Sequence, residues 1–399
     1  MIYLDHNSTT KMKKEASEDI FAKLDGYALN PSSIHGFGRE ARKMLEDARN
    51  RIANNLGISL GRGAYKIIFT SGGTESNNLV IKNFTNDYIL YSAVEHASVK
   101  DVVEKISDKA IKIPVNKNGI IDLDFLDKTL EKTHNERLKN NTEKEDNTKI
   151  LVSVMTANNE TGVLQPVEEI SKIAHKHGAY LHTDAVQALG KIDFNLKNID
   201  ADYVSLSAHK IGGLVGSGVL IAKDSHQLEA QISGGGQEKG ERSGTENVLG
   251  AMSFAKALEL SINNLQKYTQ KVRMLKEFLD KEVEKINGAE IIAQKSHRLP
   301  NTTMLALKNI SSDMQLIQFD LAGIAVSNGS ACSSGKVKSS HVLEAMGYEK
   351  DIANSAIRVS LSSDNTIDDV KSFISVFKNI AKSKYNDNAD IIDYQKHIA

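Results

Sequence analysis

Apolar residues recur three or four positions apart between His35 and Ile58, a spacing that predicts one amphipathic helix. Its expected buried face consists of Phe37, Ala41, Leu45, Ala48, Ile52 and Leu56. Farther along, short apolar runs alternate with helical segments such as PVEEISKIAHKHG. Six runs predict strands: KIIFT (66–70), YILYS (88–92), KILVSVM (149–155), AYLHTDAV (179–186), ADYVSLS (201–207) and GVLIAK (218–223). Strands that alternate with helices predict an α/β fold with a mostly parallel sheet covered on both faces.

The pattern changes after residue 252. An amphipathic stretch over 253–286 leads to strand-like AEIIAQ, TTMLAL and AIRVSLS, and a helical segment over 367–383 closes the chain. This order predicts a smaller α+β domain. We therefore expect a large domain over residues 16–256 and a small domain made of residues 1–15 and 257–399. The polar segment 132–149 predicts an exposed loop or insertion.

The composition is ordinary for a soluble globular protein, with 40% hydrophobic and 25% charged residues among 399. A formal net charge of −1 gives no general attraction to nucleic acid or to anionic membranes. No apolar run approaches the roughly 18 residues needed to cross a bilayer, and the N-terminus lacks a signal-peptide pattern. We therefore expect a cytoplasmic protein that binds neither membrane nor nucleic acid directly.

The chain contains one cysteine, Cys332, within the segment SNGSACSSG (327–335). A single cysteine excludes an intramolecular disulfide and a multi-thiolate zinc site. Buried structural cysteines usually have apolar neighbours, whereas this one lies among small residues. The pattern indicates a loop cysteine that solvent can reach, and an inert surface thiol is the alternative.

Polar residues follow several of the predicted strands, and parallel sheets bind ligands at the carboxyl ends of their strands. Gly73 and Thr74 lie between a predicted strand and a predicted helix. The backbone N–H groups at such a position can hold a phosphate, and the alternative is that the two residues only cap the helix. Lys210 follows the strand at 201–207. A desolvated amine there can form a Schiff base, although most lysines of the chain are expected on the surface. Ser207 and His209 beside it offer further donors to an anion.

Three more residues have both a chemical and a structural interpretation. Asp184 at the end of a strand can pair with a cationic ring nitrogen or cap the next helix, and Gln187 lies close to it. His96 follows the strand at 88–92 and could equally be a packing residue. Arg358 lies in an apolar run, so it needs a carboxylate partner from a substrate or from the chain itself.

The glycine-rich segment GGGQEKGERSGTEN (234–247) is not a nucleotide P-loop, because Glu241 follows Gly240 where that motif requires lysine. Each remaining candidate alone fits a structural role. Together they provide an amine nucleophile, a partner for a ring nitrogen, phosphate donors and an arginine that can bind a carboxylate. A pyridoxal phosphate enzyme acting on an amino acid requires this set.

The motifs YLDHNSTT, FTSGGTESNNL, EHASV, NNETGVLQP, HTDAVQALGK, SAHK, GGGQEKGERSGT and SNGSACSSG occur in the order of a known family. Over about nine-tenths of its length the chain resembles the class I cysteine desulfurases of the NifS/IscS type, which are fold-type I pyridoxal phosphate enzymes. The resemblance implies that Lys210 holds the cofactor as a Schiff base. It also implies that Asp184 pairs with the pyridinium nitrogen and that Gln187 binds the phenolic oxygen.

Further roles follow from the same resemblance. His96 would stack on the cofactor ring and assist proton transfer, Asn159 would contact both cofactor and substrate, and Arg358 would bind the substrate. The phosphate would be held by Gly73, Thr74, Ser207 and His209. Thr245 would complete the phosphate site of a partner subunit, which implies a homodimer with shared active sites.

The implied reaction converts L-cysteine to L-alanine and leaves the sulfur as a persulfide on Cys332. The sulfur would then pass to an iron–sulfur scaffold protein or to another acceptor for tRNA or cofactor thiolation. No resident metal is implied, apart from transient contact of Cys332 with an iron–sulfur cluster.

Three alternatives remain at this point. A selenocysteine lyase or an aminotransferase could share the fold, although an aminotransferase would not need Cys332. A non-catalytic sulfur-assembly scaffold is disfavoured, because Lys210, Asp184, His96 and Cys332 are all present.

Overall fold

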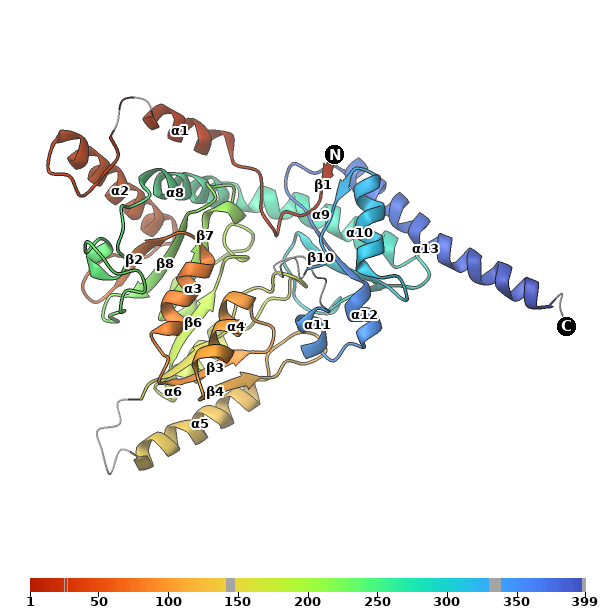
Figure 1. The fold of residues 1–399 in the computed structure, drawn as a ribbon, viewed down its shortest axis with the longest axis horizontal. Helices are drawn as coiled ribbons and strands as arrows, with labels where there is room; N and C mark the ends of the chain where they lie inside the picture. The colour runs from red at the N-terminus through yellow and green to blue at the C-terminus, as the bar shows by residue number, and fades with distance from the viewer. Residues whose placement is uncertain (25, 27, 141–147, 330–338, 397–399) are drawn as a thin grey trace.

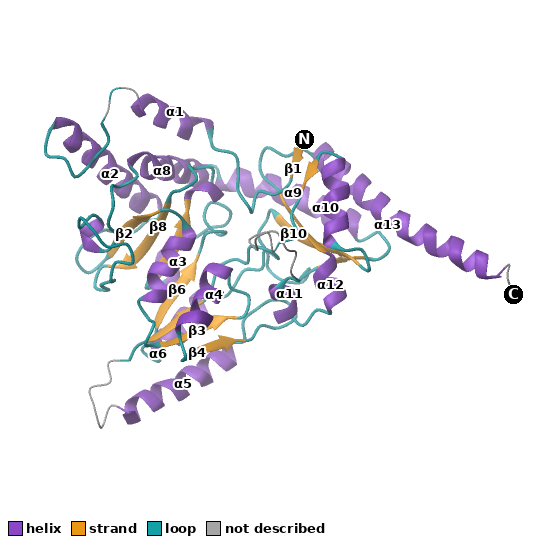
Figure 2. Ribbon diagram, in the orientation of Figure 1, coloured by secondary structure: helices purple, strands orange, loops and turns teal. Residues whose placement is uncertain are grey.

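The computed structural model describes the chain except residues 25, 27, 141–147, 330–338 and 397–399. The described strands form two large groups (Figures 1 and 2). The strands are β1 Ile2–Tyr3, β2 Tyr65–Thr70, β3 Tyr88–Ser92, β4 Ala110–Ile113, β5 Ile150–Ser153, β6 Tyr180–Asp184, β7 Tyr203–Ser207, β8 Gly218–Lys223, β9 Ala289–Ile291, β10 Thr302–Leu307, β11 Ile324–Ala325 and β12 Ala356–Ser360.

The helices cover these strands and connect them (Figure 1). They are α1 Lys14–Leu24, α2 Gly36–Asn55, α3 Gly73–Lys82, α4 Ala97–Ile106, α5 Leu123–Asn140, α6 Val167–Lys176, α7 Leu196–Ile199, α8 Val248–Asn263, α9 Leu265–Val283, α10 Ser312–Leu321, α11 His341–Ala345, α12 Lys350–Ser355 and α13 Ile367–Lys396. Two short 3₁₀ helices are η1 Ala208–Lys210 and η2 Glu238–Gly240.

A seven-stranded sheet forms the larger layer, in the order β2-β8-β7-β6-β5-β3-β4. All neighbouring pairs are parallel except those that involve β8, which runs antiparallel to β2 and β7. The six strands predicted from apolar runs are all present, and the α/β fold class with a mostly parallel sheet is confirmed. The edge strand β4 has no matching prediction.

Both faces of this sheet are buried, which explains why its strands read as unbroken apolar runs. On β2, Ile67 and Phe69 pack into one core together with α2 and α8, while Ile68 packs into another with α3 and α4. The same alternation holds on β8, where Val219 and Leu220 belong to opposite cores. Figure 1 shows α3 and α4 in front of the sheet.

A three-stranded antiparallel sheet, in the order β12-β10-β9, forms the centre of the second group. One face packs against α9, α10 and α13, where the rings of Phe319 and Phe373 stack with centroids 4.6 Å apart. The N-terminal strand β1 pairs with β11, and Leu4 is buried in the same core. Residues at the start of the chain therefore lie beside residues near its end.

Several sequence-based expectations differ from the structure. Phe37 is 53% exposed, unlike the other predicted core residues of α2. The polar segment expected to form a loop over 132–149 is helical as far as Asn140, because α5 extends into it, and 141–147 lie outside the described residues. The stretch over 253–286 is divided into α8 and α9 at Asn264.

The predicted domain division between residues 256 and 257 stays a prediction and falls within α8. A search of the described helices finds none with the length and apolar character required to traverse a bilayer.

Candidate active site

A cavity of about 320 Å³ lies at the carboxyl edge of the large sheet, within the roughly 300–1,000 Å³ range of small-molecule sites. Strands β2, β3, β5, β6 and β7 end toward this edge, so the residues that follow them meet there despite their separation in sequence. Ten residues predicted from the sequence line the cavity: Gly73, Thr74, His96, Asn159, Asp184, Gln187, Ser207, His209, Lys210 and Arg358.

Asp184 is held rigidly at the end of β6. Its Oδ2 accepts a hydrogen bond from Asn77 Nδ2 at 2.7 Å, and its Oδ1 accepts one from the backbone N–H of Val186 at 3.0 Å. Asn77 also donates to Ser98 Oγ at 2.8 Å, which joins α3 to α4 behind the carboxylate. A fixed carboxylate at only 8% exposure suits a cationic nitrogen in the cavity.

The turn before α3 provides backbone donors at the other end of the cavity. The first N–H groups of a helix have no partner within the helix and favour an anion. A side chain at Gly73 would come within 2.7 Å of Val186, and one at Gly218 would come within 2.5 Å of the backbone of Gly72. Glycine is therefore required on both sides of this turn. With Ser207 and His209 nearby, the turn fits a phosphate group.

Lys210 lies in the 3₁₀ turn η1, directly after β7. Its Nζ donates to the backbone oxygens of Asn7 and Ser8, both at 2.6 Å. Burial, together with the charges of Lys210 and Lys191, lowers the pKa of neighbouring His209 to about 4. His209 is therefore neutral near pH 7, and one ring nitrogen can donate to an anion.

His96 caps α4 at the end of the loop after β3. Its Nδ1 accepts a hydrogen bond from the backbone N–H of Ser98 at 3.1 Å and lies 2.8 Å from Ser98 Oγ. Since a nitrogen that accepts from a backbone N–H is unprotonated, the proton of the neutral ring is on Nε2. The cap thus fixes both the position and the tautomer of a ring that lines the cavity.

Arg358 reaches the cavity from β12 of the second sheet and is 3% exposed. Its Nη2 lies 2.6 Å from Asp5 Oδ1 and 2.9 Å from Ser8 Oγ, and its Nη1 donates to the backbone oxygen of Asn159 at 2.9 Å. Its buried Nε has no hydrogen-bond partner in the part of the chain that the structure describes. The internal carboxylate considered as one partner for this arginine is therefore present, and one buried donor remains for a ligand.

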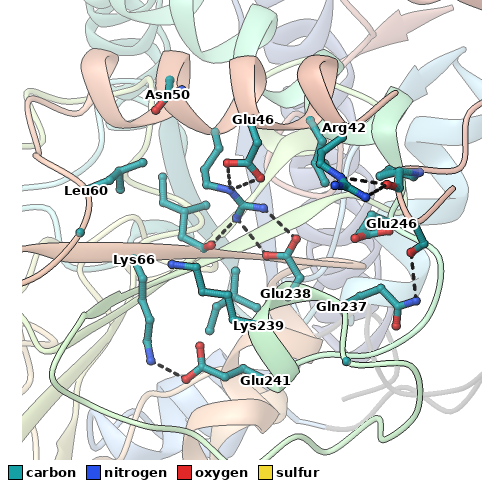
Figure 3. A pocket seen from close by; sticks show the side chains of 18 of the residues that line it. Arg42, Glu46, Asn50, Leu60, Lys66, Gln237, Glu238, Lys239, Glu241 and Glu246 are labelled. Carbon is teal, nitrogen blue, oxygen red and sulfur yellow. Dashed lines mark hydrogen bonds and ion pairs between the residues drawn. The ribbon is translucent and has the colours of Figure 1, made fainter. Parts of the chain in front are cut away.

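The glycine-rich segment after β8 encloses a different cavity of about 470 Å³ with α2 and β2 (Figure 3). Figure 3 shows Lys66 and Glu241 directed at one another, and Arg49 pairs with Glu238 at 2.9 Å. Thr245 is exposed and does not line the cavity that contains Asp184 and Lys210. Its contact with a partner subunit stays a prediction.

The predicted nucleophile, Cys332, lies outside the described residues, as do its neighbours from 330 to 338. Gly329, the last described residue before this gap, lines the same cavity as Lys210 and Arg358.

Sequence analysis missed three residues that organise the site. Asn7 and Ser8 belong to the motif YLDHNSTT, but no role was assigned to them. Lys191 lies in HTDAVQALGK and is buried at 4% exposure. A run of polar residues close to the N-terminus is a weak signal, because only the tertiary fold reveals that these residues are buried.

The set of donors fits a phosphorylated heteroaromatic ring better than a metal or a nucleotide. One end of the cavity offers N–H and O–H donors, the middle offers a fixed carboxylate and an amine, and Arg358 provides a cation for a second anionic group. Such a set can bind a charged ring and an amino acid together.

The chain has clear relatives among known proteins. The family model described as aminotransferase class-V matches residues 2–373. Sequence identity to the cysteine desulfurase IscS of Dictyoglomus turgidum is 38% over 389 residues, which cover 95% of this chain and 94% of the relative. The corresponding protein of Clostridium botulinum is 33% identical, with 99% of this chain and 98% of the relative covered.

Two solved structures are similar over most of the chain. A NifS-like protein from Rickettsia africae superposes with a TM-score of 0.87 at 41% identity, covering 96% of this chain and 99% of the other. A structure described as SspA in complex with cysteine superposes with a TM-score of 0.73 at 26% identity, covering 90% of this chain and 99% of the other.

Proposed function

The chain belongs to the aminotransferase class-V family, as a cysteine desulfurase of the IscS and NifS type, and from that premise we propose how its residues perform the reaction. L-Cysteine is converted to L-alanine, and the sulfur is held as a persulfide on Cys332. The convergence of Lys210, Asp184 and Arg358 on one cavity is the observation that supports this proposal most strongly. The similar structure that contains cysteine supports the choice of substrate.

The family implies pyridoxal phosphate, and the cavity has a suitable residue for each part of it. Gly73, Thr74, Ser207 and His209 would hold the phosphate, Asp184 the ring nitrogen and Gln187 the phenolic oxygen, with Asn159 beside the ring. When bound, the cofactor supplies an electron sink for the substrate carbon. Lys210 would hold the cofactor covalently, because its amine is the one lysine amine that lines the described part of this cavity.

Arg358 would bind the carboxylate of cysteine. Its side chain is fixed by Asp5, Ser8 and Asn159, so little conformational entropy is lost when the substrate binds. The carboxylate would also satisfy the buried Nε, which otherwise leaves a costly unpaired donor.

Lys210 and His96 would transfer protons. Lys210 Nζ is held by two carbonyl oxygens that can only accept, so its hydrogens are directed by Asn7 and Ser8. The neutral His96 ring has its proton on Nε2, since Nδ1 accepts from Ser98. In this form His96 can donate a hydrogen bond from Nε2 to a group within the cavity, and it would transfer a proton as the imidazolium.

The sulfur step uses the thiolate of Cys332. The thiolate attacks the sulfur of the substrate, an S–S bond forms, and the C–S bond breaks with its electron pair on carbon. A proton added to that carbon gives alanine, and the Cys332 persulfide retains the sulfur. No external oxidant is required.

We further propose a cytoplasmic homodimer in which Thr245 completes the phosphate site of the partner subunit. The exposure of Thr245 and its absence from the cavity of its own chain support this arrangement. The persulfide would pass to an iron–sulfur scaffold protein or to an acceptor for tRNA or cofactor thiolation.

Two variants test the proposal. With pyridoxal phosphate, L-cysteine and a thiol reductant, the wild-type protein should release alanine and sulfide in equal amounts. Cys332→Ala should retain the visible absorbance of the bound cofactor but form no persulfide, whereas Lys210→Ala should lose that absorbance. Alanine release by Cys332→Ala at the wild-type rate would contradict the sulfur step, and 3-mercaptopyruvate formed only when a keto acid is added would indicate an aminotransferase.

A further inference from the structure

A buried lysine lies beside the proposed cofactor site without lining its cavity. Lys191 lies at the end of the turn after β6 and is 4% exposed. Its Nζ donates to Gln187 Oε1 at 2.6 Å and to Asn7 Oδ1 at 2.8 Å, and neither partner is charged. Lysines are almost never fully buried unless they are paired, and within the described residues no ion pair involves Lys191. Packing alone does not explain an amine at this position.

The surroundings of Lys191 are electrostatically unfavourable for its charge. Burial lowers its pKa well below the ordinary value, and the nearby cations Lys210 and Arg358 lower it further. A methionine of similar volume would fill the same space without this cost, as replacements of buried ionic groups by apolar ones show. The amine is therefore retained at a cost in stability, which suggests that its hydrogen bonds have a function.

Those hydrogen bonds determine how two side-chain amides are oriented. A lysine amine has N–H donors in either protonation state, at least two of them. Both amide groups turn their oxygens toward Lys191. The remaining bonds of the two amides agree with this orientation, because Gln187 Nε2 and Asn7 Nδ2 each donate to a backbone oxygen, which can only accept.

The orientation of Gln187 has a direct consequence for the cavity. With Oε1 on Lys191, its Nε2 faces the other way and donates one hydrogen to the backbone oxygen of Asn7 at 2.9 Å. Nε2 has a second hydrogen, and Gln187 lines the cavity. The side chain thus offers a ligand a donor rather than an acceptor.

Asn7 anchors the same network to the second sheet. Its Nδ2 donates to Thr302 Oγ1 at 2.9 Å, and its backbone N–H donates to Ser360 Oγ at 2.9 Å. The backbone oxygen of Asn7 also accepts from Lys210. Through Asn7, Lys191 is therefore connected to the Lys210 amine, which would bind the cofactor, and to β10 and β12. Arg358 lies on β12.

We propose that Lys191 is a positioning residue for the cofactor, which acts by fixing the Gln187 amide with Nε2 as the donor to the phenolic oxygen of pyridoxal phosphate. This inference rests on the proposed function, in which Gln187 binds that oxygen. A purely structural lysine would affect stability alone. A positioning lysine must also change the spectrum of the bound cofactor, because the phenolic oxygen is part of the chromophore.

The test is a pH titration of the visible absorbance of the purified holoenzyme. A donor to the phenolic oxygen stabilises its deprotonated form, so its loss moves the spectral transition to higher pH. Lys191→Met should shift the midpoint upward by about 0.5 to 1 pH unit and weaken cofactor retention about five- to tenfold, as expected for one hydrogen bond. Gln187→Ala should shift it in the same direction.

A double variant separates this mechanism from others. If Lys191 acts through Gln187, the variant with both Lys191→Met and Gln187→Ala should match Gln187→Ala within about 0.2 pH unit, because the two effects are not additive. Additive shifts would overturn the proposal. Among the described residues that line the cavity, the charged and titratable ones are unchanged in these variants: His96, Asp184, His209, Lys210 and Arg358.

Lys13→Met is the matched control for charge. Lys13 and Lys191 both line a neighbouring cavity of about 560 Å³, but no hydrogen bond joins Lys13 to Gln187. Lys13→Met should leave the midpoint unchanged, and a shift equal to that of Lys191→Met would show that lost charge, rather than the hydrogen bond, is the cause.

The outcomes distinguish this proposal from the function on which it rests. If the wild-type protein forms no visible chromophore with pyridoxal phosphate, the proposed function fails. If it does and Lys191→Met titrates like wild type, the positioning role alone is refuted. Should Lys191→Met not fold, Lys191→Leu gives the same comparison with another side chain that cannot donate to Gln187, and an unchanged midpoint would refute the role equally.

Discussion

Replacing Arg358 with glutamine should selectively weaken the use of cysteine. The substitution removes the cation that β12 brings to the cavity and leaves Asp5, formerly 2.6 Å from the guanidinium, without its partner. The substrate carboxylate would then meet a carboxylate instead of a guanidinium. Binding should suffer from a lost attraction and from a new repulsion.

The expected magnitude follows from the geometry. Unit charges about 4 Å apart interact by about 4 kcal/mol at the effective dielectric constant of about 20 that suits protein sites. Water already stabilises the carboxylate of the free substrate, so the net contribution of Arg358 is smaller than the full interaction energy. We expect the substitution to remove about 2–4 kcal/mol of transition-state stabilisation. At about 1.4 kcal/mol per factor of ten, kcat/KM for cysteine should fall about 30- to 700-fold.

The assay is alanine release at saturating pyridoxal phosphate, with Arg298→Gln as the matched control. Arg298 is also buried, at 5% side-chain exposure, and its Nη2 lies 3.0 Å from Asp280, but it does not line the cavity of Lys210. Both variants should lose stability, whereas Arg358→Gln alone should lose kcat/KM. Equal kcat/KM values in the two folded variants would refute substrate binding by Arg358.

Two further predictions concern stability. His182 is buried between Ser153 and Ser205, and burial lowers its pKa to about 3. As the pH falls below about 6.5, the ordinary pKa of histidine, the unfolded chain therefore binds a proton that the folded chain does not. Because of His182, the free energy of unfolding should be about 2 kcal/mol lower at pH 5 than at pH 7. In urea unfolding, His182→Gln should lose correspondingly less stability between these pH values. An equal loss in the variant and the wild type would contradict the assignment. Lys66→Met should lower the free energy of unfolding by about 3–5 kcal/mol because Glu241 is left buried without its partner, and adding Glu241→Leu should restore most of it. Failure of the second substitution to restore stability in urea unfolding would show that the ion pair is not the cause.

The sequence alone was sufficient for all strands of the large sheet except β4 and for much of the lining of the candidate site. Strand periodicity and burial on both faces are local properties, so six strands of the large sheet could be located from their apolar runs. The rule that ligands bind at the carboxyl ends of parallel strands then selected Gly73, Asp184 and Lys210, which the structure places in one cavity. Side chains at the ends of neighbouring parallel strands are close whatever the rest of the fold does.

Tertiary structure decided what no local pattern contains. Arg358 enters the cavity because β12 lies beside the N-terminal segment, where Asp5 and Ser8 fix its guanidinium. The hydrogen bond from Lys191 to Asn7 joins residues separated by 184 positions, and the orientation of the Asn7 amide depends on which donors packing brings to it. Periodicity reports which face of an element is buried, but only the packed chain determines which polar groups share that interior and must satisfy one another.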